Sequence, residues 1–123
     1  MCRVFAIAFV IAAGCQANNA NTITCPKTNP PTYQSFGQNF FATFCTPCHS
    51  ATSPDRNMAP SNINFDTEAE ILENADDINM NAGYGPEGPN RFMPYMPGPV
   101  TTPPTDDQRK TLAEFLACEE AEP

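Results

Sequence analysis

Histidine, tryptophan and basic residues are scarce in this chain. Its 123 residues include one histidine, no tryptophan and six Lys and Arg, against fourteen Asp and Glu, which gives a formal net charge of −8. Nucleic-acid binding requires a basic surface, so this charge balance excludes it. No segment alternates apolar and polar side chains for long enough to predict a β-sheet. The sequence therefore favours one small all-α domain.

A long apolar run is missing as well, because the N-terminal one falls short of the ~20 residues that span a bilayer as a helix. With Arg3 in front of it, this run predicts an export signal over residues 1–14. The signal ends in Ala-Ala-Gly and Cys15 follows it, a sequence that resembles the lipobox of bacterial lipoproteins, so we expect Cys15 to be lipidated. An ordinary signal peptide cleaved near Ala17 or Ala20 is the alternative.

Residues 15–24 continue with small and polar side chains that carry no charge, which is typical of a flexible tether. The folded domain is therefore expected over residues 25–123. Export would take this domain to the bacterial periplasm, and acyl chains on Cys15 would anchor it to a membrane surface.

The segment Cys45-Thr46-Pro47-Cys48-His49 has the pattern C-x-x-C-H and contains the single histidine. Two thiols at this spacing can reach the vinyl groups of a haem, and the next imidazole can turn under the iron as an axial ligand. One histidine leaves little for a zinc site to use. The motif predicts one covalently attached haem c with His49 on its iron. A redox dithiol is the alternative, but the strand–helix alternation of a thioredoxin-like domain is missing.

Cys25 and Cys118 remain when the signal, the lipid and the haem have taken the other four cysteines. They lie at opposite ends of a domain that is bound for an oxidising compartment, where disulfides persist. We predict that they form a disulfide. Two free, buried thiols are the alternative.

Three segments carry the pattern of a capping box, in which a Ser or Thr N-cap is followed three residues later by Glu or Gln. The pattern predicts helices that begin at Ser35, Thr67 and Thr105. The first runs into the C-x-x-C-H motif, and the other two are expected to end near Asn81 and Cys118.

Residues 83–104 hold seven of the fourteen prolines, which exclude a helix or a central strand. A loop this long inside a small domain is usually functional. Met93 and Met96 both lie in it, and each precedes a proline. The loop is therefore suited to present a methionine to the iron.

The chain resembles the monohaem class I cytochromes c, and in particular small exported bacterial members. Gly37, Phe41 and Cys45 stand four residues apart, as in the first helix of that family, and Phe115 has the place of the aromatic residue that packs on it. The resemblance implies an all-α, small cytochrome c-like fold. About three main helices would surround the covalent haem, with a long Pro-rich loop that carries the methionines.

The resemblance also implies the axial ligands and their surroundings. Met96 stands nine residues before Thr105, the spacing usual for the second ligand, whereas Met93 stands twelve before it. His49 and Met96 are therefore the expected ligands, with Met93 as the alternative. In this family a proline carbonyl accepts the Nδ1–H of the proximal histidine, and Pro60 is the candidate.

Arg91, or Arg56 as a second candidate, could pair with a haem propionate. Iron with both axial positions filled binds no substrate readily, so the expected function is one-electron transfer to redox partner proteins rather than catalysis. The acidic chain would suit a partner with a basic docking face. A haem enzyme or ligand sensor with an open sixth site is the alternative.

Overall fold

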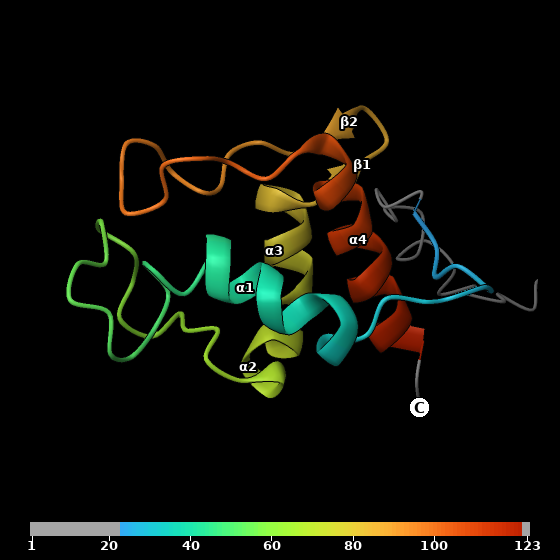
Figure 1. Cartoon of the computed structure of the whole chain (residues 1–123), viewed down its shortest axis with the longest axis horizontal. Helices are drawn as coiled ribbons and strands as arrows, with labels where there is room; N and C mark the ends of the chain where they lie inside the picture. Colours follow the sequence, from blue (N-terminus) through green and yellow to red (C-terminus); the bar gives the residue numbers. More distant parts are fainter. Residues whose placement is uncertain (1–22, 122–123) are drawn as a thin grey trace, which may run out of the picture.

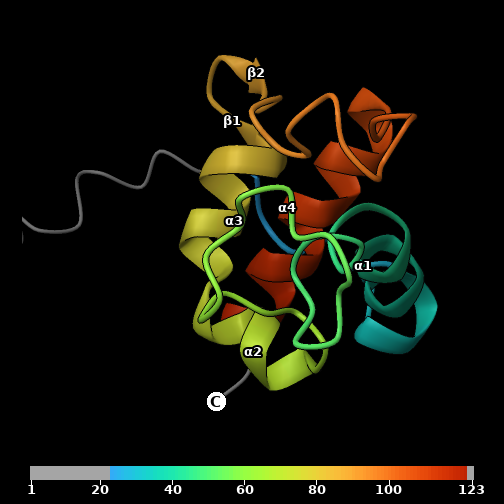
Figure 2. The same ribbon diagram turned by 90° about the vertical axis from the view of Figure 1, so that its left-hand side faces the viewer.

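Four α-helices and one two-residue β ladder make up the regular structure of residues 23–121, together with a π-helical turn. These residues are the part of the chain that this computed structural model describes. The predicted export signal and Cys15 lie outside it. Figures 1 and 2 show the helices packed against one another, with two long loops extending from one side of them. The predicted all-α class is confirmed.

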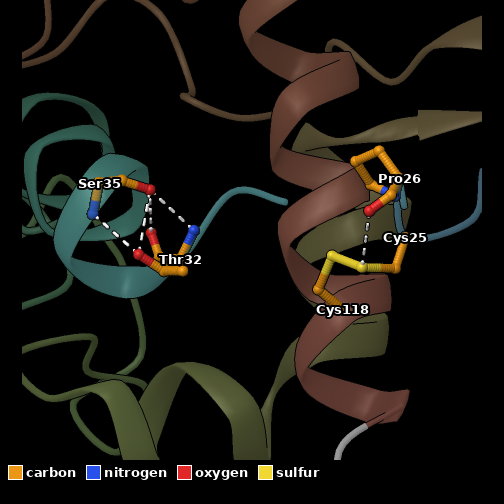
Figure 3. Close-up of a disulfide and its surroundings, with 5 residues drawn as sticks. All are labelled: Cys25, Pro26, Thr32, Ser35 and Cys118. Atoms are coloured by element: carbon orange, nitrogen blue, oxygen red, sulfur yellow. Dashed lines mark hydrogen bonds between the residues drawn. A yellow bond between two sulfur atoms is a disulfide. The ribbon is translucent and has the colours of Figure 1, made fainter. Parts of the chain in front are cut away.

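The first helical segment begins one turn earlier than predicted. Thr32 is the N-cap of the π-helical turn η2 (Tyr33–Gly37), which leads directly into α1 (Gln38–Phe44). The Thr32 Oγ1 accepts from the Ser35 N–H at 3.1 Å, and the Ser35 Oγ accepts from the Thr32 N–H at 2.9 Å (Figure 3). Ser35 is therefore the third residue of a capping box and not the N-cap that the sequence predicted.

The second predicted helix starts where expected but is divided in two. Thr67 forms the predicted capping box with Glu70 at the start of α2 (Glu68–Glu73), and α3 (Ala75–Ala82) follows after Asn74. The Asn74 Nδ2 donates to the Glu70 carbonyl at 2.8 Å. An Asn side chain that donates to the carbonyl four residues earlier competes with the backbone N–H groups of the helix for that acceptor, which accounts for the break.

The last helix, α4 (Asp106–Ala121), is the longest, and Thr105 caps it as predicted. The Gln108 Oε1 accepts from the Thr105 N–H at 2.8 Å, and the Thr105 Oγ1 accepts from the Gln108 N–H at 3.2 Å. Between α3 and α4, β1 (Tyr84–Gly85) pairs antiparallel with β2 (Gly88–Pro89). This short pairing was not predicted, because two residues show no alternation.

The core forms where α4 crosses the first helical segment. Phe115 of α4 is fully buried, and its ring centroid lies 6.4 Å from that of Phe41 in an edge-to-face arrangement. A Cβ added at Gly37 would lie 3.2 Å from the Phe115 Cζ, so the glycine permits the close approach of η2 and α4. Further apolar residues of all four helices, together with Phe65 of the loop before α2, complete this cluster: Phe40, Phe65, Ile71, Ile78, Leu112 and Leu116.

Cys25 and Cys118 lie at disulfide distance, with their sulfur atoms 2.01 Å apart (Figure 3). The bond joins the N-terminal segment to α4 over a sequence separation of 93 residues. Within the described residues, no helix has the length and apolar character that crossing a membrane requires.

Candidate functional site

A cavity of about 500 Å³ opens between the end of α1, α3 and the two long loops. Its volume is in the range of pockets that enclose organic ligands, roughly 300–1,000 Å³. Most of the wall is apolar, and it is formed by side chains of four segments: Phe44, Ile63, Phe65, Ile78, Ala82 and Pro104. Figure 2 shows the loop after α1 and the loop before α4 on the same side of the helices.

The C-x-x-C-H motif forms a turn at one wall of this cavity. α1 ends at Phe44, and the backbone N–H groups of Cys48 and His49 both donate to the Cys45 carbonyl, at 3.1 and 2.8 Å. This turn brings the two thiols and the imidazole to the cavity, which all three line. Both cysteines are free.

His49 is fixed by one hydrogen bond and one ring contact. Its Nδ1 lies 3.1 Å from the Ile63 carbonyl oxygen, and its ring centroid lies 4.9 Å from that of Phe65. The Pro60 carbonyl, which the sequence suggested as acceptor, receives the Ile63 N–H at 3.1 Å instead. Pro60 thus closes a turn, and this turn places the carbonyl of Ile63, three residues later, next to the imidazole.

Arg56 holds the loop that supplies this carbonyl. Its Nη2 donates to the carbonyls of Ile63 and Pro60, at 3.0 and 2.6 Å, and its Nε donates to Ala59. Its Nη1 donates to the Asn64 Oδ1 at 2.9 Å and to the Ser50 carbonyl. Arg56 lines the cavity, but these five bonds occupy its guanidinium with the protein's own oxygens.

Burial shapes the ionisation of the three motif side chains. It raises the pKa of the Cys45 thiol to about 12 and also raises the pKa of Cys48. It lowers the pKa of His49, although the hydrogen bond to Ile63 acts in the opposite direction. The neutral imidazole that results is the form that binds metal. A redox dithiol depends on a lowered thiol pKa, so this environment argues against that alternative.

The two candidate methionines differ in position. Met93 lines the cavity and packs against the core, whereas Met96 is 42% exposed and does not line it. The Met93 N–H donates to the Asn81 carbonyl at 2.8 Å, and the Met93 carbonyl accepts from Arg109 at 2.8 Å. On spacing, the sequence predicted Met96 as the second axial ligand, with Met93 as the alternative. The position of Met93 in the cavity favours Met93 for this role.

Arg91 lies away from the cavity and is already paired. Its guanidinium binds the Asp106 carboxylate through three contacts of 2.7 to 3.2 Å, and both side chains are more than half exposed. Asp106 is in the first turn of α4, so this pair joins the proline-rich loop to the start of that helix. The predicted pairing of Arg91 with a propionate is therefore not supported.

Sequence reasoning missed Arg109, which contacts the backbone of Met93, and Ile63, which contacts His49. Ile63 gave no signal, because it acts through a carbonyl that every residue has. Arg109 did give one: it precedes Leu112 by three residues and Leu116 by seven, which places it on the buried face of α4.

The fold and the cavity define a small helical protein in which two thiols, one imidazole and the thioethers of Met58 and Met93 line a largely apolar space. A protein-family model described as Cytochrome c matches residues 35–118. The chain belongs to this family, since the match covers more than half of its length. Searches of curated proteins and of solved structures found no match.

Family membership means a covalently bound haem c with its iron, a role in electron transfer and redox partner proteins. Cytochrome c domains are typically exported. The residues of the cavity fit this cofactor: two free thiols, an imidazole whose Nδ1 is engaged so that Nε2 is left for a metal, and an apolar wall.

Proposed function

We propose that this protein carries single electrons on a haem bound covalently to Cys45 and Cys48, with His49 and Met93 as axial ligands. The observation that supports the proposal is that all four side chains line one apolar cavity. Haem c, when bound, supplies an iron that takes up and releases one electron. The protein contributes the two ligands and a largely apolar wall around them.

The proximal side is supported by the contacts of His49. Its Nδ1–H donates to the Ile63 carbonyl, which selects the tautomer with a free Nε2 and orients the ring. The neighbouring Phe65 ring restricts rotation of the imidazole. These two contacts would hold the imidazole in one orientation, with its Nε2 available for the iron.

The distal side is supported by the position of Met93, and this assignment replaces the spacing-based choice of Met96. A thioether ligand stabilises ferrous iron and raises the reduction potential relative to a second imidazole. Two filled axial positions leave no site for substrate or O₂. The proposed function is therefore electron carriage and not catalysis.

Location and docking are further parts of the proposal. An export signal over residues 1–14 and lipidation of Cys15 would place the domain on a membrane surface facing the bacterial periplasm. The formal charge of −8 suits a partner with a basic docking face. Met58 and Tyr95 are 87% and 50% exposed and line the cavity, so they offer apolar contacts beside the haem site.

Visible spectra of the haem-loaded full-length chain test this function. We expect a c-type reduced spectrum that CO does not change in the wild type or in Met96→Ala. In Met93→Ala, CO should shift the reduced spectrum at once, because the sixth position is open. If CO shifts the reduced spectrum of Met96→Ala but not that of Met93→Ala, Met96 is the axial ligand and the assignment to Met93 is wrong. A prompt shift in the wild type would overturn electron carriage in favour of a haem enzyme or sensor.

A further inference from the structure

Arg109 is a charged side chain in the interior of the molecule. It is 2% exposed, and its Nη1 donates to the carbonyls of Ala82, Asn90 and Met93, each at 2.8 Å. These oxygens belong to the C-terminus of α3 and to the proline-rich loop. One nitrogen of α4 thus joins three segments beside the cavity.

No carboxylate pairs with Arg109 among residues 23–121. Asp106 acts on it electrostatically but binds Arg91 instead. The Arg109 Nε is also the one buried side-chain nitrogen or oxygen of the described residues without a hydrogen-bond partner. Burying an unpaired charge is costly. An apolar residue at this position would avoid the free-energy cost of burying a charge. The presence of a charge therefore suggests that it has a function.

The Arg109 contacts converge on the proposed iron ligand. The Met93 carbonyl accepts from Arg109, and its N–H donates to the Asn81 carbonyl of α3. The main chain of Met93 is thereby held on both sides between α3 and α4. Met96 lies three residues further along the same loop and is 42% exposed. The bonds of Arg109 therefore act on Met93, the candidate ligand of this loop that lines the cavity.

The positive charge also acts on the wall of the haem site. Arg109 lowers the pKa of Cys45, although burial outweighs that effect. A guanidinium keeps its charge in proteins. A fixed positive charge near an iron favours the oxidation state that carries less positive charge, which is the ferrous one.

We propose that Arg109 is a positioning residue for the axial ligand Met93, and that its buried charge raises the reduction potential of the haem. This inference rests on the proposed function, because it requires Met93 on the iron. It adds a residue of α4, distant in sequence from the C-x-x-C-H motif, to those that affect the ligation and the reduction potential of the iron.

The test compares Arg109→Met, Arg109→Lys and the wild type as haem-loaded full-length proteins. Arg91→Met is the matched control, since it removes an exposed guanidinium from the same region. Three readouts are taken: the ferric charge-transfer band of sulfur-bound iron, CO binding to the reduced protein, and the reduction potential.

In Arg109→Met we expect a weaker charge-transfer band, a lower potential and a fraction of CO-reactive protein about tenfold higher, equivalent to ~1.4 kcal/mol. Arg109→Lys keeps the charge but not the guanidinium geometry. Its potential should therefore fall less than that of Arg109→Met, while its band is still weakened. Arg91→Met should match the wild type in all three readouts.

A folded Arg109→Met protein with wild-type band, CO behaviour and potential would overturn the inference. If Arg109→Met does not fold, Arg109→Lys decides, and wild-type values in its band and CO binding overturn the positioning role. A wild-type protein that itself lacks the band and binds CO would show a failure of the proposed ligation. That result is distinct from a failure of Arg109 alone.

Discussion

The carbonyl oxygen of Ile63 serves two donors. The His49 Nδ1 lies 3.1 Å from it and the Arg56 Nη2 lies 3.0 Å from it. The acceptor of the second imidazole nitrogen sets how strongly a ligating histidine donates to a metal. Because a guanidinium shares this oxygen, it is a weaker acceptor for His49 than an unshared carbonyl would be. If His49 binds the iron as proposed, Arg56 would weaken electron donation by this ligand through the shared Ile63 carbonyl.

Replacing Arg56 by Met should lower both stability and reduction potential. The change removes five hydrogen bonds that organise the loop after the motif. We expect the free energy of unfolding to fall by about 2–4 kcal/mol, since bonds to a charged group contribute ~1.5–3 kcal/mol each and water replaces some of them. The potential should fall because Ile63 then accepts more strongly from His49. Chemical denaturation and redox titration of the haem-loaded protein measure the two effects.

Arg91→Met is the control for Arg56→Met, because its ion pair with Asp106 is more than half exposed on both sides. Such a surface pair contributes about 0–1 kcal/mol. Equal losses in the two variants would contradict the role given to Arg56.

Asp66 should make the loop sensitive to acid. Hydrogen bonds from Ser50 and the Ala51 N–H hold the pKa of its carboxyl below the ordinary value of 3.8. A carboxylate with a lowered pKa stabilises the fold fully above the ordinary value, and the contribution is lost as the pH falls through the lowered pKa. Asp66→Asn should therefore be less stable than the wild type at neutral pH and lose less on further acidification. Chemical denaturation at a series of pH values measures the free energy of unfolding of both proteins. A difference between wild type and Asp66→Asn that stays constant as the pH falls would contradict the prediction.

At the scale of elements, the crossing of η2 and α4 depends on the absence of a side chain at Gly37. An added Cβ would lie 3.0 Å from the Tyr33 Cδ2 and 3.2 Å from the Phe115 Cζ. Phe115 is fully buried and has no room to withdraw. The contact is therefore tight on the side of α4.

Gly37→Ala is expected to destabilise the protein by about 1–3 kcal/mol, the usual cost of overpacking, even though Ala favours a helix. Gly85→Ala is the control, since its added Cβ would meet nothing closer than Asn90 at 3.6 Å. Thermal unfolding of the two haem-loaded variants measures the difference. A Gly37→Ala protein as stable as Gly85→Ala would show that η2 and α4 separate easily.

The helices could be predicted because their start signals are local. Thr67 and Thr105 each bond to a partner three residues away, and the sequence displays both members of each pair. The error at Ser35 arose because Ser35-x-x-Gln38 fits the predicted pattern, whereas the N-cap in the structure, Thr32, bonds to a Ser three residues later instead of a Glu or Gln. The interruption at Asn74 depends on one side-chain bond to Glu70, which composition does not reveal.

Only those residues of the haem site that are close together in the sequence could be predicted. Cys45, Cys48 and His49 lie within one turn, so their spacing alone indicated a common role. The choice between Met93 and Met96 depends on contacts with α3 and α4 that are distant in sequence. Spacing along a proline-rich loop carries no information about those contacts.

For the whole molecule, the link between Cys25 and Cys118 is a long-range constraint, because it joins residues at a sequence separation of 93. Its removal in a Cys25→Ser/Cys118→Ser double variant should lower the free energy of unfolding by up to about 4–5 kcal/mol. Denaturation of the haem-loaded protein without reductant measures this loss. The visible spectrum should stay unchanged, because the bond lies on α4 away from the cavity.

Reductant should shift the wild-type denaturation midpoint toward that of the double variant and leave the variant where it was. A wild-type midpoint that reductant does not move would contradict a stabilising disulfide.

The same bond determines where a mechanical load would enter the domain. Residues 23–31 run along the side of α4 opposite to the two loops that border the cavity (Figures 1 and 2). Tension on the chain before Cys25 passes through the disulfide into α4 and bypasses both loops. A pulling force applied to the N-terminal segment would therefore act on α4 through Cys118, on the side of the helix away from the haem cavity.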